Sequence, residues 1–425
     1  MDQIYTGEVK KLSIPHEKGL DHTCNMLLEG YNYIGNRRKR FGSDIFQTRL
    51  LGENVICMGG EEAAQIFYDE TKFKRKGVAP ERVKKTLFGK KGVQGMDGSA
   101  HKHRKQLFMS FMTSDRINDL KDITERQWAI AAADWEQRRK VVLFQEAEKI
   151  MCRIACTWAG VPLWAKELNQ RTNDLSAMID AFGAIGPRHW RGRAARNRSE
   201  QWIRTIINQV RNGEYHPNEN TALYAMAWHR DLQGNRLNLK VAAVELLNIL
   251  RPIVAIGRYV TFGALAMHNV PETQQKLVTE GDDYNQMFVQ EVRRYYPFGP
   301  FLGARVHNDF MWSGYHFKKG TLTLLDIYGT NHDPDLWDMP DEFRPERFKD
   351  WQGSPFDFIP QGGGDYAMGH RCAGEWVTIE IMKVSLEFLA KRMDYYVPKQ
   401  DLRFSMTRIP SMPKSRFIIN GVTSK

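Results

Sequence analysis

Cys372 is the residue whose surroundings most clearly indicate chemistry. It lies in the stretch FDFIPQGGGDYAMGHRCAGEW, with three consecutive glycines, Gly362–Gly364, before it and Gly374 two residues after it. Three glycines in a row suit neither a helix nor a well-packed strand, so they predict a loop whose backbone can approach another group closely. The next residues, AGEWVTIEIMKVSLEFLAKRM, predict a long helix. Cys372 is therefore expected just before a helix N-terminus, where backbone N–H groups and the helix dipole favour a thiolate.

A cysteine in this position has several chemical interpretations. A buried, inert cysteine would need neither the glycines on one side nor the helix start on the other. A zinc site would need a second cysteine or a histidine pair at ligand spacing, and none accompanies Cys372. A nucleophilic cysteine would need a positioned base. A single thiolate can also be the axial ligand of haem iron.

A second unusual feature is a charge inside the longest apolar stretch, residues 239–268, which predicts one buried helix. Arg251 lies at its middle, and Pro252 follows it. Proline removes a backbone hydrogen bond and kinks a helix, and a buried charge is costly unless it is paired. Arg251 could be satisfied by carbonyls freed at the kink or by Glu245, or it could await an anionic ligand.

Two residue pairs lie at helical spacing. FVQEVRRYYPFGPF contains Glu291 and Arg294, three residues apart, and MDGSAHKHRKQLFMSFM predicts a helix with His101 and Lys105 one turn apart. Each pair alone is also compatible with an ordinary solvated helix face.

Length and composition limit the class of protein. The 425 residues are 42% hydrophobic, which suffices for a large core, and no linker, repeat or low-complexity tract divides them, so residues 1–425 predict a single domain. Five cysteines without framework spacing favour a reduced cytosolic compartment. The N-terminal segment has no apolar span, so we expect a cytoplasmic protein without a membrane anchor. The net charge of +11 is spread along the chain without a nucleic-acid motif, so no nucleic acid is expected as a partner.

The pattern of apolar residues predicts a mainly α fold with a small β region. Residues 17–42, 80–88 and 115–215 are expected to contain helices, and Val55–Met58 is expected to be a strand. The stretches WSGYHFKKGTLTLLDIYGT and FSMTRIPSMPKSRFII also look like strands. The basic run Arg188–Arg198 predicts a solvated face.

The stretch around Cys372 resembles the haem loop of the cytochrome P450 family, F-x-x-G-x-[HR]-x-C-x-G. Cys372, Gly374 and His370 fall on its cysteine, its second glycine and its basic position, although Gly369 and the three glycines are offset. The longer form PQGGGDYAMGHRCAGEW is similar to the bacterial fatty-acid peroxygenase branch of that family. That branch also carries R-P, here Arg251–Pro252, where other members have the acid and alcohol of [AG]-G-x-[DE]-T.

The resemblance assigns roles to the helical pairs. Glu291 and Arg294 match the family's E-x-x-R, and Arg347 in DEFRPERF supplies its third, structural member. His101 matches the histidine of the H-x-x-x-R pair that holds the haem propionates, and Lys105 replaces its arginine, which keeps the charge without the bidentate fork.

The resemblance implies a cytochrome P450 fold: a single helical haem domain with a small β region and no reductase domain. It implies haem b, with Cys372 as iron ligand and His101, Lys105 and His370 as further cofactor-binding residues. The expected partners are hydrogen peroxide and a long-chain fatty acid, with no redox partner. The arginine run at 188–198 could draw the negatively charged fatty acid toward the entrance.

The implied reaction is hydroxylation at the α and β carbons, with the substrate carboxylate paired to Arg251 as general acid/base. Arg251, Pro252 and Gln94 are the predicted catalytic residues. Alkene-forming relatives carry histidine where this chain has Gln94, so alkene is expected as a minor product. Gln94 could instead only cap a loop or hold a water.

Four aromatic residues are predicted to bind the substrate: Phe88, Phe182, Phe298 and Phe301. Phe182 could equally be a core residue. Three other functions stay open at this stage: a decarboxylase that yields terminal alkenes, a reductase-dependent monooxygenase, and a non-catalytic haem or gas-binding protein.

Overall fold

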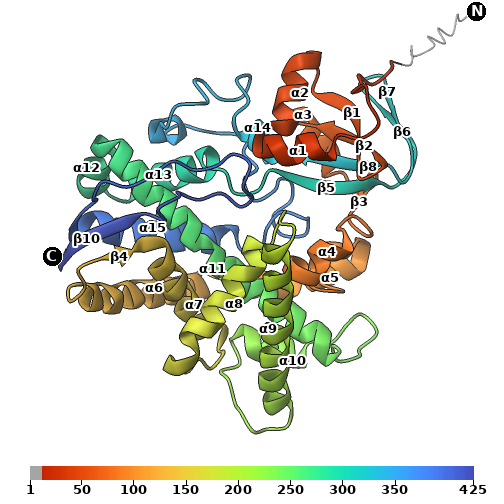
Figure 1. The fold of residues 1–425 in the computed structure, drawn as a ribbon. Helices are drawn as coiled ribbons and strands as arrows, with labels where there is room; N and C mark the ends of the chain where they lie inside the picture. The colour runs from red at the N-terminus through yellow and green to blue at the C-terminus, as the bar shows by residue number, and fades with distance from the viewer. Residues whose placement is uncertain (1–11) are drawn as a thin grey trace, which may run out of the picture.

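A computed structural model describes residues 12–425 as a mainly helical molecule with small sheets at its edges (Figure 1). The α-helices are α1 (Thr23–Glu29), α2 (Tyr33–Phe41), α3 (Glu61–Phe67), α4 (Glu81–Val83), α5 (Gly98–Met109), α6 (Ser114–Trp135), α7 (Leu143–Ala159), α8 (Leu168–Asp180), α9 (Pro187–Arg211), α10 (Ala222–Trp228), α11 (Leu239–Asn269), α12 (Pro271–Thr279), α13 (Gly281–Tyr295), α14 (Ile327–Asn331) and α15 (Glu375–Lys391). The 3₁₀ helices are η1 (Gly30–Asn32), η3 (Val93–Gly95), η4 (Ala165–Glu167) and η5 (Pro345–Phe348), and η2 (Lys84–Phe88) is a π-helix. The predicted helices in 17–42, 80–88, 115–215 and 239–268 are confirmed.

The strands form one mixed sheet and two smaller ones within residues 12–425. They are β1 (Ile45–Leu50), β2 (Glu53–Met58), β3 (Phe73–Lys74), β4 (Val141–Val142), β5 (Phe301–Val306), β6 (Phe310–Trp312), β7 (Tyr315–Phe317), β8 (Leu322–Asp326), β9 (Met393–Tyr396) and β10 (Ile418–Ser424). The mixed sheet has the order β1-β2-β8-β5-β3, and only β2 and β8 are parallel in it. It lies with α1–α3 at one corner of the molecule, in the upper right of Figure 1. The small β region is therefore confirmed.

The second predicted strand region, residues 404–419, is wrong for most of its length. It is irregular chain with one isolated bridge between Phe404 and Pro413, and only its end belongs to β10. Pro410 and Pro413 have no N–H groups, so this segment cannot donate a full ladder of hydrogen bonds.

The long helix α11 crosses the middle of the molecule and packs against α7, α9 and α15 (Figure 1). Nearly all of its residues are buried, because it is apolar on every side rather than along one stripe. Pro252 lies inside it without ending it. This helix therefore carries Arg251 into the interior, where the side chain is 5% exposed.

The basic run at 188–198 lies in α9 and is only partly a solvated face. Arg188 and Arg191 reach Asp180 at 3.2 Å, at the end of α8. Arg196, in contrast, is 1% exposed. The prediction of a solvated face is therefore wrong for Arg196, because it lies on the side of α9 that packs against α11 and η2.

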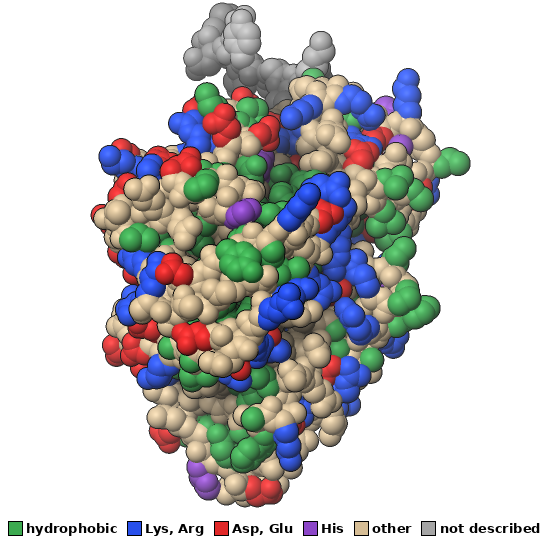
Figure 2. Space-filling view, turned by 60° about the vertical axis from the view of Figure 1, so that its left-hand side comes forward, with side chains coloured by type: hydrophobic (Ala, Val, Ile, Leu, Met, Phe, Trp, Pro, Cys, Tyr) green, Lys and Arg blue, Asp and Glu red, His purple; other side chains and the backbone are tan. Residues whose placement is uncertain are grey.

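Charged side chains of both signs cover the surface. Figure 2 shows basic residues spread among acidic and apolar ones over one face, with their densest band toward the right of the view. Within residues 12–425, every helix is too short or too polar to span a lipid bilayer.

Candidate active site

The loop before α15 places Cys372 where the sequence predicts it. Gly362 and Gly364 adopt left-handed φ angles of +90° and +78°, and a Cβ at Gly363 would lie 2.7 Å from the Pro355 carbonyl oxygen. These glycines let the loop fold tightly upon itself. The Cys372 N–H donates to the Gln361 carbonyl at 3.0 Å, and α15 begins three residues later.

Opposing effects act on the Cys372 thiol. Burial raises its pKa above the usual value, whereas a hydrogen bond from the Gly374 N–H and the positive charge of Lys105 lower it. The helix start thus lowers the pKa of Cys372 as predicted, but burial raises it by more in the protein alone. A bound metal cation would add a larger effect toward the thiolate.

A buried ion-pair network fixes the position of this loop. Glu375, the first residue of α15, accepts from Arg293 at 2.5 Å and from Arg371 at 2.6 Å. Arg293 also donates to the side chain of Gln361 at 3.0 Å, so it ties α13 to both ends of the loop. Arg293 and Glu375 were not predicted from the sequence. The available signal was that Arg293 directly precedes Arg294, and two adjacent arginines are common on any charged helix.

The predicted triad of Glu291, Arg294 and Arg347 lies together and is almost fully buried. Glu291 accepts two hydrogen bonds from Arg294, at 2.7 and 2.8 Å, and pairs with Arg347 at 3.2 Å. Arg294 also donates to the carbonyls of Asn331, Pro340 and Glu342. This cluster joins α13 to the chain between α14 and η5.

His101, Lys105 and His370 form a basic cluster next to Cys372. The two imidazole rings stack with centroids 3.9 Å apart, and Lys105 donates to the Arg371 carbonyl. Burial lowers the pKa of His101 to about 4 and that of His370 to about 2. Because both His101 and Lys105 are buried, the alternative of a solvated helix face is wrong for this pair.

Arg251 has no acidic partner among residues 12–425. Its Nη1 donates to the carbonyl of Leu87 in η2 at 2.5 Å, its Nη2 lies 3.5 Å from Oδ1 of Asn248, and its Nε has no partner. Burial and the charge of Arg196 lower its pKa to about 9, while the charge of Cys372 raises it. Arg251 is therefore still a cation at neutral pH and lies within electrostatic reach of Cys372.

Glu245, suggested as a partner for Arg251, binds elsewhere. It accepts from Arg104 in α5 at 2.6 Å and from Asn248 at 3.1 Å. The suggestion is wrong because Arg104, distant in sequence, approaches the buried carboxylate from another helix. The other suggested acceptors, the carbonyls freed at Pro252, do not bind Arg251 either. The backbone carbonyl that Arg251 does bind belongs to Leu87, which lies in η2 and not in α11.

Gln94 joins the Arg251 site through Asn248. Nδ2 of Asn248 donates to Oε1 of Gln94 at 3.2 Å, while the other end of the same amide faces Arg251. Asn248 was not singled out from the sequence. Its position three residues before Arg251 on a helix was the available signal.

The structure does not gather the four predicted aromatic residues into one cluster. Phe298 stacks on Tyr259 of α11, with centroids 4.7 Å apart, and packs against the main core. Phe301 packs instead against a separate cluster between α2 and the mixed sheet. Phe88 ends η2, next to Leu87, and Phe182 lies half-buried between α8 and α9.

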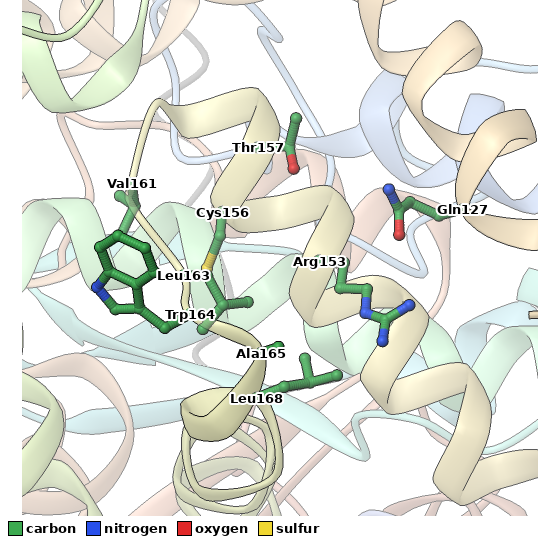
Figure 3. Close-up of a pocket in the computed structure, with 9 residues that line it drawn as sticks. All are labelled: Gln127, Arg153, Cys156, Thr157, Val161, Leu163, Trp164, Ala165 and Leu168. Atoms are coloured by element: carbon green, nitrogen blue, oxygen red, sulfur yellow. The ribbon is translucent and has the colours of Figure 1, made fainter. Parts of the chain in front are cut away.

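A surface pocket of about 330 Å³ is separate from this site (Figure 3). It opens between α6, α7 and the segment leading into α8, with Gln127 and Arg153 on one side and Trp164 on the other. None of the predicted site residues lines it.

Comparisons with known proteins decide the family. The family model described as "Cytochrome P450" matches residues 269–419. The structure of cytochrome P450EX alpha (CYP152N1) with myristic acid is 49% identical, with a TM-score of 0.94 over 97% of this chain and 100% of that one. The chain belongs to the cytochrome P450 family. The predicted cytochrome P450 fold is thereby confirmed.

Two further solved structures place the chain within this family. A variant of cytochrome P450 OleT in complex with arachidonic acid is 40% identical, with a TM-score of 0.95 over 97% of this chain and 99% of that one. Cytochrome P450SP alpha (CYP152B1) in complex with (R)-ibuprophen is 45% identical, with a TM-score of 0.93 over 95% of this chain and 99% of that one. These relatives confirm the resemblance to the fatty-acid peroxygenase branch, so the chain is a haem oxidoreductase with a cysteine thiolate ligand.

The residues present fit a haem. Cys372 offers a thiol beside a basic cluster, and Nδ1 of His101 is buried without a hydrogen-bond partner. Burial and neighbouring cations keep both histidines of that cluster neutral in the protein alone. The propionate carboxylates of a haem would give His101 and Lys105 anionic acceptors that no residue among 12–425 supplies, whereas Nε2 of His370 already lies 3.8 Å from Oδ1 of Asp97.

Proposed function

We propose that this cytochrome P450 uses hydrogen peroxide to hydroxylate long-chain fatty acids at the α and β carbons. The overall reaction takes one oxygen atom of the peroxide into a C–H bond and releases the other as water. The peroxygenase relatives, two of which are named with fatty acids, support this substrate class. The observation that carries the proposal is the buried Arg251, which lies near Cys372 and has only neutral acceptors among the residues that the structure describes.

The free energy of the buried charge favours an anionic ligand at Arg251. A guanidinium removed from water is costly unless a charge of opposite sign or a full set of acceptors compensates it. Leu87 and Asn248 supply two neutral oxygens, and Nε of Arg251 has no acceptor within residues 12–425. A fatty-acid carboxylate would supply two charged acceptors in the bidentate geometry that arginine prefers.

The same carboxylate can supply the general acid/base that the residues next to Arg251 in α11 do not provide. Cleavage of hydrogen peroxide to water requires one proton to move between its two oxygen atoms. The residues that follow Arg251 in α11, Pro252 to Ala255, carry no titratable group or alcohol. A carboxylate held by Arg251 can accept and return that proton, and such help is typically worth about 10²–10⁴ in rate.

The proposed cofactor is haem b, with Cys372 as the axial ligand and His101, Lys105 and His370 around the propionates. When bound, the haem supplies an iron centre whose thiolate ligand favours cleavage of the O–O bond. Glu291, Arg294 and Arg347 hold the scaffold behind this site. We propose residues 1–425 as one haem-thiolate domain.

The position of the carboxylate sets the position of the oxidised carbons. When Arg251 holds the carboxylate, the α and β carbons are the first ones that can reach the reacting centre. The head-group region is the space beside Arg251 and Asn248 in which the carboxylate would lie. Gln94 contacts this region through Asn248, and its amide cannot titrate. We therefore propose that hydroxylation exceeds decarboxylation to a terminal alkene.

Pro252 contributes through the backbone. It has no N–H for the carbonyl of Asn248, the fourth residue before it, so the regular bonding of α11 is interrupted at this turn. We propose that this local freedom lets Arg251 and Asn248 adapt to the carboxylate.

Hydrogen peroxide without any reductant distinguishes this function from the alternatives. Purified holoprotein, a long-chain fatty acid and peroxide should yield 2- and 3-hydroxy acids. Turnover only with a reductase and NADPH would indicate an ordinary monooxygenase. No oxidation in either mixture would indicate a non-catalytic haem or gas-binding protein.

A further inference from the structure

Two buried arginines from different helices meet at one backbone carbonyl. Arg251 of α11 and Arg196 of α9 each donate an Nη1 hydrogen bond to the carbonyl oxygen of Leu87, at 2.5 and 3.0 Å. Leu87 belongs to the π-helix η2, which also carries Phe88, and π-helical turns are frequent at functional sites. Two like charges therefore lie beside a single neutral acceptor, and the charge of Arg196 lowers the pKa of Arg251.

Arg196 is held firmly in this position. Its Nε donates to Oε1 of Glu200, one turn along α9, at 2.6 Å. A Cβ at Gly89 would lie 2.1 Å from Nη2 of Arg196 and 2.5 Å from the Val244 side chain, so glycine at this position leaves the space that the guanidinium occupies. Gly89 also has a φ of +81°, which favours glycine.

The charges around the two arginines do not balance. Glu200 pairs with Arg196 but is partly exposed, with a quarter of its side chain accessible, and Glu245 is bound by Arg104. Nη2 of Arg196 and Nε of Arg251 are buried without a partner among residues 12–425. The head-group region thus has an excess of positive charge that a ligand carboxylate would offset.

We propose that Arg196 is a positioning residue for the substrate carboxylate. It adds a second positive charge beside Arg251. When the carboxylate replaces the Leu87 carbonyl as the acceptor for Arg251, Arg196 keeps its own hydrogen bond to that carbonyl. The pair of arginines therefore selects an anionic head group over the neutral head group of an alcohol with the same chain. This inference rests on the proposed function, in which Arg251 binds the carboxylate.

The test compares the affinity of the holoenzyme for a long-chain fatty acid and for the alcohol of equal chain length, by calorimetric titration. Arg196→Gln should weaken binding of the acid at least about tenfold and change binding of the alcohol by less than about twofold. Arg193→Gln is the matched control, because Arg193 lies one turn earlier in α9 and is exposed. It should leave both affinities near those of the wild type.

A second variant predicts a change in the opposite direction. Glu200→Gln keeps an oxygen that can accept from Nε of Arg196 but removes the negative charge, so it should strengthen binding of the acid and leave the alcohol unchanged. It also carries the test if Arg196→Gln does not fold, since Glu200 is partly exposed.

Equal weakening of acid and alcohol in Arg196→Gln would show that Arg196 only supports the fold, and unchanged acid affinity in the Arg196 or Glu200 variants would also overturn the inference. Arg251→Ala is titrated beside them. If it binds the acid as tightly as the wild type, the proposed function fails. If it loses the acid while Arg196→Gln retains it, only the role of Arg196 fails.

Discussion

The side-chain amide of Asn248 donates a 3.2 Å hydrogen bond to the amide oxygen of Gln94. Asn248 lies one turn before Arg251 on α11, and its own oxygen lies 3.5 Å from Nη2 of that arginine. Gln94 lies on η3, more than 150 residues away in sequence. A residue outside α11 thus reaches the proposed carboxylate site through one amide.

Replacing Gln94 with histidine should shift the products toward terminal alkene. Histidine can titrate near neutral pH, whereas glutamine cannot. Gas chromatography of the products from a long-chain acid and peroxide measures the ratio. Gln94→Ala is the control: it removes the contact with Asn248 without adding a titratable group, so hydroxy acids should still dominate. Dominant alkene in the wild type would refute the argument from Gln94.

Replacing Cys372 with histidine should change the iron ligand. The reduced carbon monoxide complex of the wild type should show the long-wavelength absorption band of thiolate ligation, and Cys372→His should lose it while other cysteine variants keep it. Cys24→Ser is a suitable control, since Cys24 is exposed and lies outside the site. If the band persists in Cys372→His, another residue is the ligand.

The triad around Glu291 should contribute strongly to stability. Glu291→Gln leaves the buried Arg294 without its charged partner, and breaking a buried pair in this way typically costs about 3–5 kcal/mol. The thermal midpoint of the holoprotein should fall clearly. Glu346→Gln removes an exposed pair with Lys276, which is typically worth less than about 1 kcal/mol. Equal effects of the two variants would contradict the structural role of the triad.

Asp326 should make stability depend on pH. It caps α14 through Gly329, and burial raises the pKa of its carboxyl to about 7, against the effect of Arg38. Because this pKa is higher in the folded than in the unfolded state, the folded state binds more protons between about pH 4 and pH 7. The stability that Asp326 contributes is therefore full below pH 4 and is lost as the pH rises through 7.

Denaturant titrations at pH 5 and pH 8 measure this dependence. Asp326→Asn keeps the side-chain acceptor and cannot ionise, so its stability relative to the wild type should be greater at pH 8 than at pH 5. A constant difference between the two proteins at both pH values would show that Asp326 does not titrate in this range.

The sequence was sufficient for features that depend on local pattern. The long, mainly apolar stretch around Arg251 predicted α11, and the glycines next to Cys372 predicted the loop before α15. Both patterns depend on residues close together in the chain, where helical periodicity and backbone freedom act directly.

The partners of buried charges could not be predicted in the same way. Arg104, on a different helix, pairs with Glu245. Arg196 is buried, although it belongs to a run of arginines whose spacing is typical of a solvated face. Which of several arginines is buried depends on the packing of α9 against α11 and η2, and no local pattern encodes that packing. The segment at 404–419 was predicted as a strand because apolar and polar residues alternate in it, although its two prolines argue against a strand.

The central claim is that a carboxylate paired to Arg251 supplies the acid/base for peroxide cleavage. Its most direct test is the peroxide-driven oxidation of a substrate that has no carboxylate, with and without a short carboxylic acid. In the wild type the short acid should raise the rate by about 10²-fold or more, and in Arg251→Ala it should have no effect, although the haem stays bound. Equal rates with and without the short acid in the wild type, or full stimulation in Arg251→Ala, would contradict the claim.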